Sequence, residues 1–138
     1  REGLEIVAMG VSNASELPQT IDSLLNKVDA VYGLSDNLVA SSITLVSNKL
    51  IDKKIVSVFA EESQVKGGAL ITNGFSYYEL GKQTAQMAKE ILVDKKNIST
   101  IPVGLAEKTI STVNINTLKA LELDENLPLF KDAIKVGK

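Results

Sequence analysis

The sequence predicts an α/β fold, namely a doubly wound parallel sheet with helices on both faces. Apolar runs at residues 4–11, 29–34, 54–60 and 69–75 lack strict alternation of polar and apolar side chains, as in strands buried on both faces. Segments with helical spacing of apolar residues lie between several of these runs. The 138 residues, 44% of them apolar, are enough for one compact domain with its own core.

The first two predicted units are each a strand followed by a helix. A strand over residues 4–11 precedes a helix over residues 17–25, whose start Asn13 or Ser15 is expected to cap. A second strand over residues 29–34 precedes a helix over residues 38–50. This alternation is typical of parallel sheets, in which the connection between neighbouring strands runs through a helix.

The next two strands, over residues 54–60 and 69–75, are separated by a polar stretch and followed by a long helix over residues 77–93. Ser76 and Glu79 form a capping-box pattern at the start of this helix. Its face expected to be buried carries Tyr77, Leu80, Thr84, Met87, Ala88 and Ile91.

The rest of the chain has less regular patterns. Residues 94–100 are polar, and residues 101–115 are expected to be extended. A short helix near residues 116–121 and a turn around residues 128–134 complete the prediction.

Composition and charge narrow the possible functions. The formal net charge is −2, with Lys and Arg scattered among Asp and Glu, so no basic surface for nucleic acid or a membrane is expected. The chain has no cysteine and no histidine, which removes disulfides, thiolate nucleophiles, the usual general base and the commonest metal ligand. We therefore predict neither a cofactor nor a metal.

No apolar run approaches the roughly 20 residues that span a bilayer, and the amino end does not resemble a signal peptide. Arg1 is not an initiator methionine, and a strand-like run begins almost at once. We therefore expect a processed product or a piece of a longer protein.

The predicted fold places polar residues together at one edge of the sheet. Right-handed crossovers bring the carboxyl ends of parallel strands to the same edge, where doubly wound sheets bind their ligands. Three carboxylates lie there with no cation before Lys66, which favours a ligand such as an amine. The edge residues are Ser12, Asn13, Ser35, Asp36, Asn37, Glu61, Glu62, Ser63, Asn73 and Gly74.

Phosphate ligands are not expected at this edge. No G-x-G-x-x-G or G-x-x-x-x-G-K-[ST] pattern follows a predicted strand, and Gly67 and Gly68 lead into a strand rather than a helix. Nucleotide and dinucleotide cofactors are therefore disfavoured. A phosphoacceptor domain would need paired acids after the first strand, where this chain reads "GVSNAS".

Each candidate residue also has a purely structural explanation. Asp36 and Asn37 stand at a predicted helix start, where such residues commonly cap the helix. Glu61 and Glu62 are also explained as solvated loop charges. Tyr77 is either a core or surface side chain, or a ring that stacks on a ligand from the first turn of its helix.

Three segments resemble a known family in their order and spacing, namely "VDAVYGLSDNLVAS", "GGALITNGFSYYELGKQTAQMAKEIL" and "STVNINTLKALEL". They resemble the substrate-binding proteins of bacterial ABC importers, and within these the tryptophan/tyrosine-type binding proteins. The likeness extends over essentially the whole chain, and "YYELGKQTAQMAKEIL" is its most specific part.

The resemblance implies one lobe of a type I periplasmic-binding-protein-like fold, in which two doubly wound lobes close on a ligand between their facing strand edges. Residues 1–138 correspond to the carboxyl-terminal solute-binding lobe, without the amino-terminal lobe that family members carry before it. Residues 76–138 are expected to include segments that return to that missing lobe, or that pair with another copy.

The resemblance also implies a function. The chain is expected to bind a small amino-acid-like ligand, aromatic by family likeness, without catalysing a reaction, and to deliver it to the membrane permease of an ABC importer. A lipoprotein anchor in the parent and an extracellular or periplasmic location are also implied. Asp36 maps onto a cleft aspartate of the family and Glu61 or Glu62 onto a nearby acid, so a carboxylate is expected to pair with the ligand's ammonium group.

Two other functions remain open from the sequence. A ligand-sensing effector domain of a transcription regulator has the same architecture, and a helix-turn-helix in the missing amino-terminal part would identify it. A small enzyme would use Asp36 with Glu61 or Glu62 as acid and base, although no nucleophile elbow or metal cluster supports that chemistry.

Overall fold

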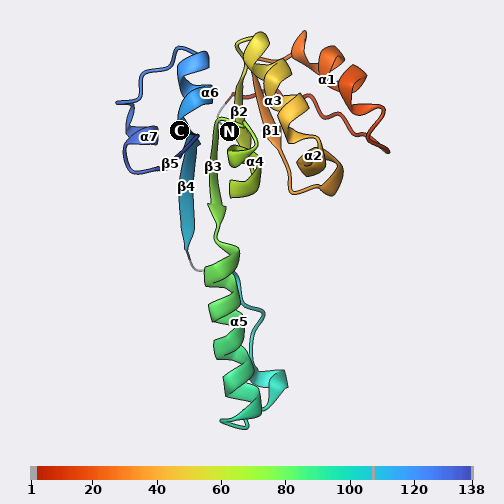
Figure 1. Ribbon diagram of the computed structural model, residues 1–138. Coiled ribbons are helices and arrows are strands. Elements are labelled where there is room, and N and C mark those ends of the chain that lie inside the picture. Colours follow the sequence, from red (N-terminus) through yellow and green to blue (C-terminus); the bar gives the residue numbers. More distant parts are fainter. Residues whose placement is uncertain (1–2, 107, 138) are drawn as a thin grey trace.

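The computed structural model describes residues 3–106 and 108–137 and shows a five-stranded sheet in the order β1-β2-β3-β4-β5 (Figure 1). The predicted α/β class is confirmed. The sheet is mixed rather than wholly parallel, because the chain re-enters it in the opposite direction at β4 and β4 pairs antiparallel with β3. The strands are β1 (Ala30–Gly33), β2 (Val56–Phe59) and β3 (Ile71–Phe75), which are parallel, and β4 (Thr109–Asn114) and β5 (Ile134–Val136), which are parallel to each other.

Helices connect most of these strands, and two of them differ from the prediction. The sequence predicts one helix over residues 38–50, but Ser42 separates two, and α4 lies in the polar stretch for which no helix is predicted. The helices are α1 (Leu17–Leu25), α2 (Asn37–Ser41), α3 (Ile43–Asp52), α4 (Glu62–Lys66), α5 (Tyr77–Leu92), the 3-10 helix η1 (Ile98–Thr100), α6 (Ile115–Ala120) and α7 (Pro128–Lys131).

Two clusters of buried side chains form the core. The first lies under α1, α3 and α4 and includes Ile21, Leu50 and Phe59. The second lies under α6 and α7 and includes Ile71 and Phe130. The sheet therefore has apolar contacts on both sides, but α1, α2 and α3 lie beside β1 and β2, whereas α6 and α7 lie beside β4 and β5 (Figure 1).

The prediction of a strand over residues 4–11 is wrong. Residues 3–11 form no strand, and Leu4 and Ile6 are 84% and 87% exposed. The apolar pattern is that of a strand, but a strand requires a neighbour for its backbone groups, and the described chain does not place one beside it.

The long helix α5 matches its predicted bounds, but its predicted burial is wrong. None of its residues, all of which are described, is buried, including the face that carries Leu80 and Met87. The helix leaves the sheet at the end of β3 and extends away from it, and the chain then returns along the helix (Figure 1). We call residues 76–106 the arm.

The expected extended segment over residues 101–115 forms a strand only in β4, and Glu107 lies outside the described residues. The strand β5 is not among the predicted elements, which end with the turn around residues 128–134. Within the part of the chain that the structure describes, no helix is long and apolar enough to cross a lipid bilayer.

Candidate functional site

The ends of β1 and β2 bring the predicted acidic residues to one edge of the sheet. The two strands are parallel with Gly33 opposite Phe59, so the loops that begin at residues 34 and 60 leave the sheet side by side. A side chain at position 33 would not fit, because a Cβ there would overlap the ring of Phe59. This carboxyl edge, which we define as residues 34–37, 60–63 and 75–77, is also where α5 leaves the sheet (Figure 1).

Asp36 is the N-cap of α2. Its Oδ1 accepts hydrogen bonds from the backbone N–H groups of Leu38 at 2.8 Å and Val39 at 3.0 Å. The structural explanation for this residue is therefore correct. Capping also fixes the carboxylate in position, since two backbone donors hold one of its oxygens while the side chain stays exposed.

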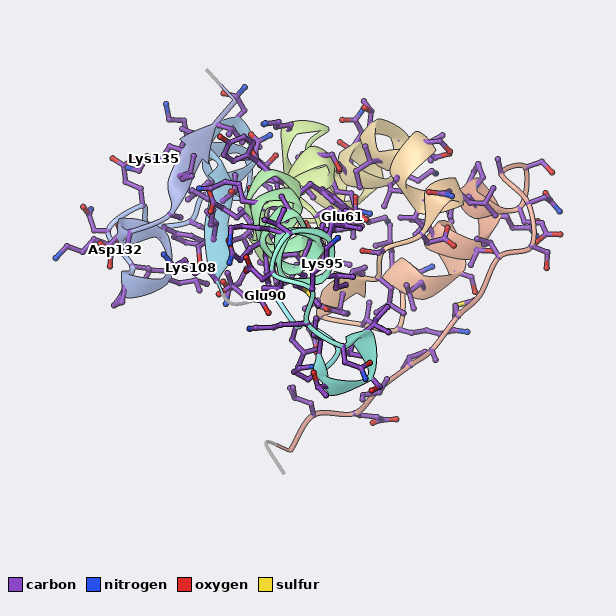
Figure 2. All side chains as sticks on the ribbon, turned by 90° about the horizontal axis from the view of Figure 1, so that it is seen from below. Glu61, Glu90, Lys95, Lys108, Asp132 and Lys135 are labelled. Carbon is purple, nitrogen blue, oxygen red and sulfur yellow. The ribbon has the colours of Figure 1, made fainter. Side chains whose placement is uncertain are left out.

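Glu61 and Glu62 lie at the start of α4, the helix that the sequence did not reveal. The backbone N–H of Glu61 donates to Gln64 Oε1 at 3.1 Å, and Ser63 Oγ donates to Glu61 Oε2 at 3.3 Å. Glu62 forms an ion pair with Lys66 at 2.6 Å, one turn further along the helix. Glu61 and Glu62 are both half-buried. In the view from below, Glu61 lies beside α5, and Asp132 and Lys135 lie on the opposite side of that helix (Figure 2).

Four further predicted residues divide into two groups. Ser35 and Asn37 flank Asp36 at the carboxyl edge and are exposed. Ser12 and Asn13 are not placed there by a strand, because residues 3–11 form none. Their polar groups are instead used locally: Ser12 N–H donates to Glu16 Oε2 at 2.9 Å and Asn13 Nδ2 donates to Glu16 Oε1 at 2.7 Å.

The expected cap of α1 is also corrected by these contacts. Asn13 Oδ1 accepts from the backbone N–H of Ser15 at 3.1 Å and closes a turn before the helix. The N-cap position itself is Glu16, whose side chain makes no capping bond. Pro18 lies in the first turn, where its missing N–H leaves one donor fewer to satisfy.

Tyr77 begins α5 and packs edge-to-face against Phe75, with ring centroids 5.2 Å apart. Tyr77 remains 63% exposed, so its ring is available at the carboxyl edge. Sequence reasoning did not select Phe75 or Ser76 as edge residues, although both line a small cavity of about 10 Å³ together with Glu62. The parallel register of β2 and β3 was the available signal, since it places the residues after both strands side by side.

A second hollow begins at the carboxyl edge, where Phe75 and Ser76 are among the residues that line it. It is an open groove of about 470 Å³ along the arm, between α5 and residues 101–106. Leu80, Met87 and Pro102 are among the residues that line it, and Gln83 Nε2 spans it with a hydrogen bond to the Leu105 carbonyl at 2.8 Å. Most of its lining belongs to the arm, and Asp36 and Glu61 are not among its lining residues.

The carboxylates of the carboxyl edge are chemically suited to a cation or to a ligand with several hydrogen-bond donors. Among the described residues, no group of three His, Cys, Asp or Glu side chains is placed to hold a metal ion. Glu122, which lies outside this edge, has a carboxyl group whose pKa is lowered. A hydrogen bond from Lys54 Nζ at 2.7 Å, with the positive charge of that lysine, lowers the pKa of Glu122.

Comparison with known proteins identifies the family of this chain. The sequence profile of the family described as ABC transporter substrate binding protein matches residues 1–136. The chain belongs to this family. The resemblance seen in the sequence is therefore confirmed, and homologues of the chain are substrate-binding proteins rather than enzymes.

Individual relatives agree with this assignment. A tyrosine-binding protein of Clostridioides difficile is 37% identical over all 138 residues of the chain. A solved substrate-binding protein with adhesive properties from Clostridium difficile, in a ligand-free, open form, is 35% identical and superposes on 99% of the chain with a TM-score of 0.80. A streptococcal ABC domain in complex with L-Trp has a TM-score of 0.81 over 97% of the chain, and at 23% identity this likeness shows the fold.

The chain is shorter than the proteins it resembles. It spans 39% of the length of the tyrosine-binding protein and 45% of the solved protein from Clostridium difficile.

Proposed function

We propose that the chain is the solute-binding lobe of an ABC importer's binding protein, and that it helps to hold an aromatic amino acid in a cleft between two lobes. The observation that carries the proposal is the similarity of the whole chain, at 37% identity, to a tyrosine-binding protein. The carboxyl edge supports it, because its carboxylates suit the ammonium group that every free amino acid carries.

Asp36 is the residue we propose to contact that ammonium group. Its Oδ1 is used by the two backbone N–H groups of α2, whereas its Oδ2 accepts no hydrogen bond from the described residues. One oxygen therefore caps the helix and the other is free for a ligand. Ser35 and Asn37 on either side add short polar side chains that can bond the ligand's carboxylate or backbone groups.

Glu61, Glu62 and Tyr77 have supporting roles in the proposal. Glu61 and Glu62 make the edge acidic, but Glu62 is already paired with Lys66 at 2.6 Å, so Glu61 is the better candidate for direct contact. The exposed ring of Tyr77, held against Phe75, is suited to stack on an aromatic side chain of the ligand. Ser12 and Asn13 are proposed only as rim residues, since Glu16 holds both.

The arm is proposed to return to the second lobe. The lining of its groove mixes apolar residues such as Leu80 with charged ones such as Glu79 and Lys82, and the groove has no cover within the described chain. Val103 and Leu105 on the returning segment are 90% and 80% exposed. Such a surface is unusual for a globular domain that works alone and is typical of an interface. The second lobe is the occupant that a two-lobed binding protein provides.

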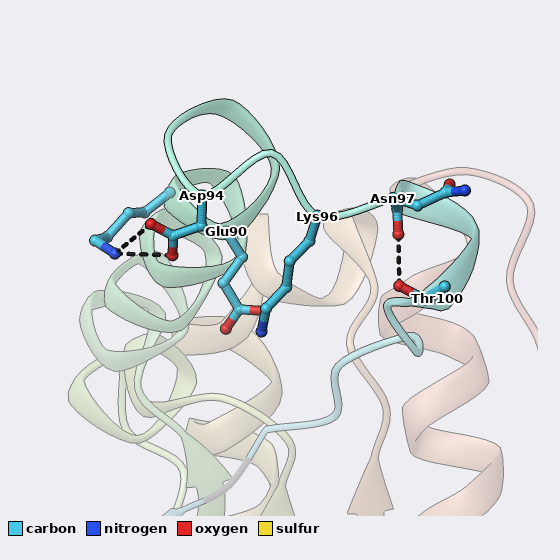
Figure 3. A network of polar contacts seen from close by, with 6 residues as sticks. Glu90, Asp94, Lys96, Asn97 and Thr100 are labelled. Carbon is cyan, nitrogen blue, oxygen red and sulfur yellow. Dashed lines mark hydrogen bonds and ion pairs between the residues drawn. The ribbon is translucent and has the colours of Figure 1, made fainter.

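The arm is built as a defined element rather than a loose extension. At its tip, ion pairs join Lys89 to Asp94 at 2.9 Å and Lys96 to Glu90 at 3.0 Å (Figure 3). At the base of the arm, the strand that leads into it and the strand that follows it are paired, since Phe75 of β3 lies opposite Thr109 of β4. Closure of the two lobes would therefore bend the chain at the β3–β4 pair and leave the conformation of the arm unchanged.

The other parts of the proposal concern the full-length protein. Binding proteins of this family typically work in the periplasm or outside the cell, and we place this one there, with a lipoprotein anchor outside these residues. Closure of both lobes around the ligand would produce the form that a membrane permease accepts. A single lobe is therefore expected to bind weakly.

Native mass spectrometry of the full-length protein tests the ligand. The protein is purified gently, and its mass is compared before and after denaturation. We expect a bound small molecule with the mass of tyrosine or tryptophan, and tight rebinding of that amino acid by calorimetry with weak binding of glycine as the control. An empty protein that also fails to bind a panel of free amino acids would refute the ligand assignment.

A further inference from the structure

The small cavity at the carboxyl edge lies over a glycine of β3. Side chains alternate along paired strands, so Thr72 and Gly74 of β3 share one face of the sheet with Thr112 and Ile110, which lie opposite them on β4. All four residues line the cavity, whose volume is about 10 Å³. Thr72 and Thr112 are each 1% exposed, so two hydroxyl-bearing side chains are buried beside this cavity.

The hydroxyl group of Thr72 is buried without a hydrogen-bond partner from the protein. Its Oγ1 makes no hydrogen bond with any of the described residues, although almost no solvent reaches it. Leaving a buried hydroxyl unpaired is costly, so nearly all such groups in folded proteins bond either to a protein atom or to an internal water. The Thr72 hydroxyl therefore needs a partner that the described residues do not supply.

Gly74 leaves the space in which such a partner fits. A Cβ at position 74 would lie 3.0 Å from Thr72 Oγ1 and 2.5 Å from the Ala60 carbonyl oxygen, so both oxygens border the place where other residues carry a side chain. The φ angle of Gly74 is not positive, so its backbone conformation does not require glycine. A glycine inside a strand often marks a close approach by another group. The space beside Gly74, rather than its backbone, therefore explains the glycine.

The size and lining of the cavity restrict what can occupy it. A volume of about 10 Å³ is close to the smallest that holds a buried water, and such a water commonly makes about three hydrogen bonds to polar groups. Thr72 Oγ1 and the Ala60 carbonyl oxygen are two partners, and Thr112 and Glu62 on the cavity wall carry further oxygen atoms. An apolar occupant would leave the Thr72 hydroxyl unpaired.

We propose that this cavity binds one water molecule, which accepts a hydrogen bond from the Thr72 hydroxyl and donates one to the Ala60 carbonyl oxygen. The register that joins β2 to β3 is Val58 opposite Ile71, and Ala60 lies beyond it. The water therefore links the two strands past their paired position, where the arm leaves the sheet. The proposal does not depend on which solute the protein binds, because the cavity is too small for an amino acid.

A high-resolution crystal structure of the ligand-free, full-length protein tests the water directly. We expect density for one ordered water, with oxygen-to-oxygen distances of about 2.5 to 3.0 Å to Thr72 Oγ1 and to the Ala60 carbonyl. A Thr72 hydroxyl that bonds to a protein atom instead, or a side chain from the rest of the polypeptide in the cavity, would overturn the proposal. Because no solute is present, neither result bears on the proposed amino-acid ligand.

Two substitutions, compared by thermal unfolding of the same protein, test the hydrogen bond. Thr72→Val exchanges the hydroxyl for a methyl group of similar size and should lower Tm by about 2 °C or more, because the buried water loses a partner. Ser47→Ala is the matched control, since Ser47 Oγ is also buried and unpaired among the described residues, but Ser47 lines neither the small cavity nor the groove of the arm. This control should leave Tm nearly unchanged. Removing a hydroxyl that has no partner costs nothing, so an unchanged or higher Tm in Thr72→Val would refute the water.

Discussion

Asp36 offers a way to separate capping from ligand binding, because the two roles depend on different properties of its side chain. Capping needs an oxygen that accepts the Leu38 and Val39 N–H groups, which are 2.8 and 3.0 Å away. Asparagine caps a helix about as well as aspartate does, so Asp36→Asn should change the stability by no more than about 0.5 kcal/mol. Asp36→Ala removes the cap and should cost about 1 kcal/mol.

The affinity for the ligand depends instead on the negative charge of Asp36. A hydrogen bond between charged groups contributes about 1.5 to 3 kcal/mol, so Asp36→Asn should weaken the binding of an aromatic amino acid roughly 10- to 150-fold. Calorimetry on the full-length protein gives the affinity, and thermal unfolding without ligand gives the stability. Asp124→Asn is the matched control, since Asp124 also holds a backbone N–H, that of Asn126 at 2.9 Å, in the turn between α6 and α7.

The combination of the two measurements decides the role of Asp36. Lost affinity with unchanged stability in Asp36→Asn identifies a ligand carboxylate. Wild-type affinity in Asp36→Asn, together with a lower Tm in Asp36→Ala, would show that Asp36 is a cap alone and refute the proposed contact. A similar loss of affinity in the Asp124→Asn control would point to a general effect of charge rather than to this site.

Two further predictions concern the support of the site and the response to pH. Gly74→Ala would place a Cβ 2.5 Å from the Ala60 carbonyl oxygen at the carboxyl edge. In a thermal unfolding assay this substitution should destabilise the protein by about 1 to 3 kcal/mol. Asn73→Ala in the same strand is the control and should have little effect in the same assay. Lys54→Met should raise the pKa of Glu122 toward its usual value, measured by an NMR titration of the carboxyl group. Because the folded-state pKa of Glu122 is lowered, its pairing with Lys54 stabilises the protein above the unfolded-state pKa and stops doing so as the pH falls through the folded-state pKa. The stability difference between wild type and Lys54→Met should therefore shrink in acid, and a difference that grows in acid would contradict this sign.

The sequence was sufficient to predict several of the elements that pack against their neighbours within this chain. β1, β2 and β3 lie where the apolar runs were, and α5 begins after Ser76, which accepts a hydrogen bond from the Glu79 N–H at 3.4 Å as its pattern predicted. The short helix α4 was missed because five residues are too few for a periodic pattern, and Gln64, a polar residue, occupies one of its buried positions. The direction of β4 could not be predicted, since it depends on where the arm returns the chain.

The site was predicted in part for a related reason. Parallel strands place the residues after β1 and β2 at one edge, so the position of Asp36 and Glu61 at this edge was predicted from topology alone. Ser12 and Asn13 were placed there by the same rule, and the rule failed because the strand before them has no neighbour within the described chain. A pattern shows which face of a segment is apolar, but it does not show whether the covering surface belongs to the same piece of chain.

Ligand binding should separate the surfaces that complete the fold from the surface that contacts the solute. The groove of the arm is open in the described chain, and we infer that the second lobe covers it whether or not a ligand is present. The carboxyl edge is polar and exposed, so only this edge should change when an aromatic amino acid binds. Hydrogen exchange on the full-length protein should therefore slow on ligand addition at residues 36–39 and 61–64 and stay unchanged at residues 4–11. Slowing at residues 4–11 with none at the carboxyl edge would mean that the ligand binds near residues 4–11 instead, because protection follows the surface that the ligand contacts.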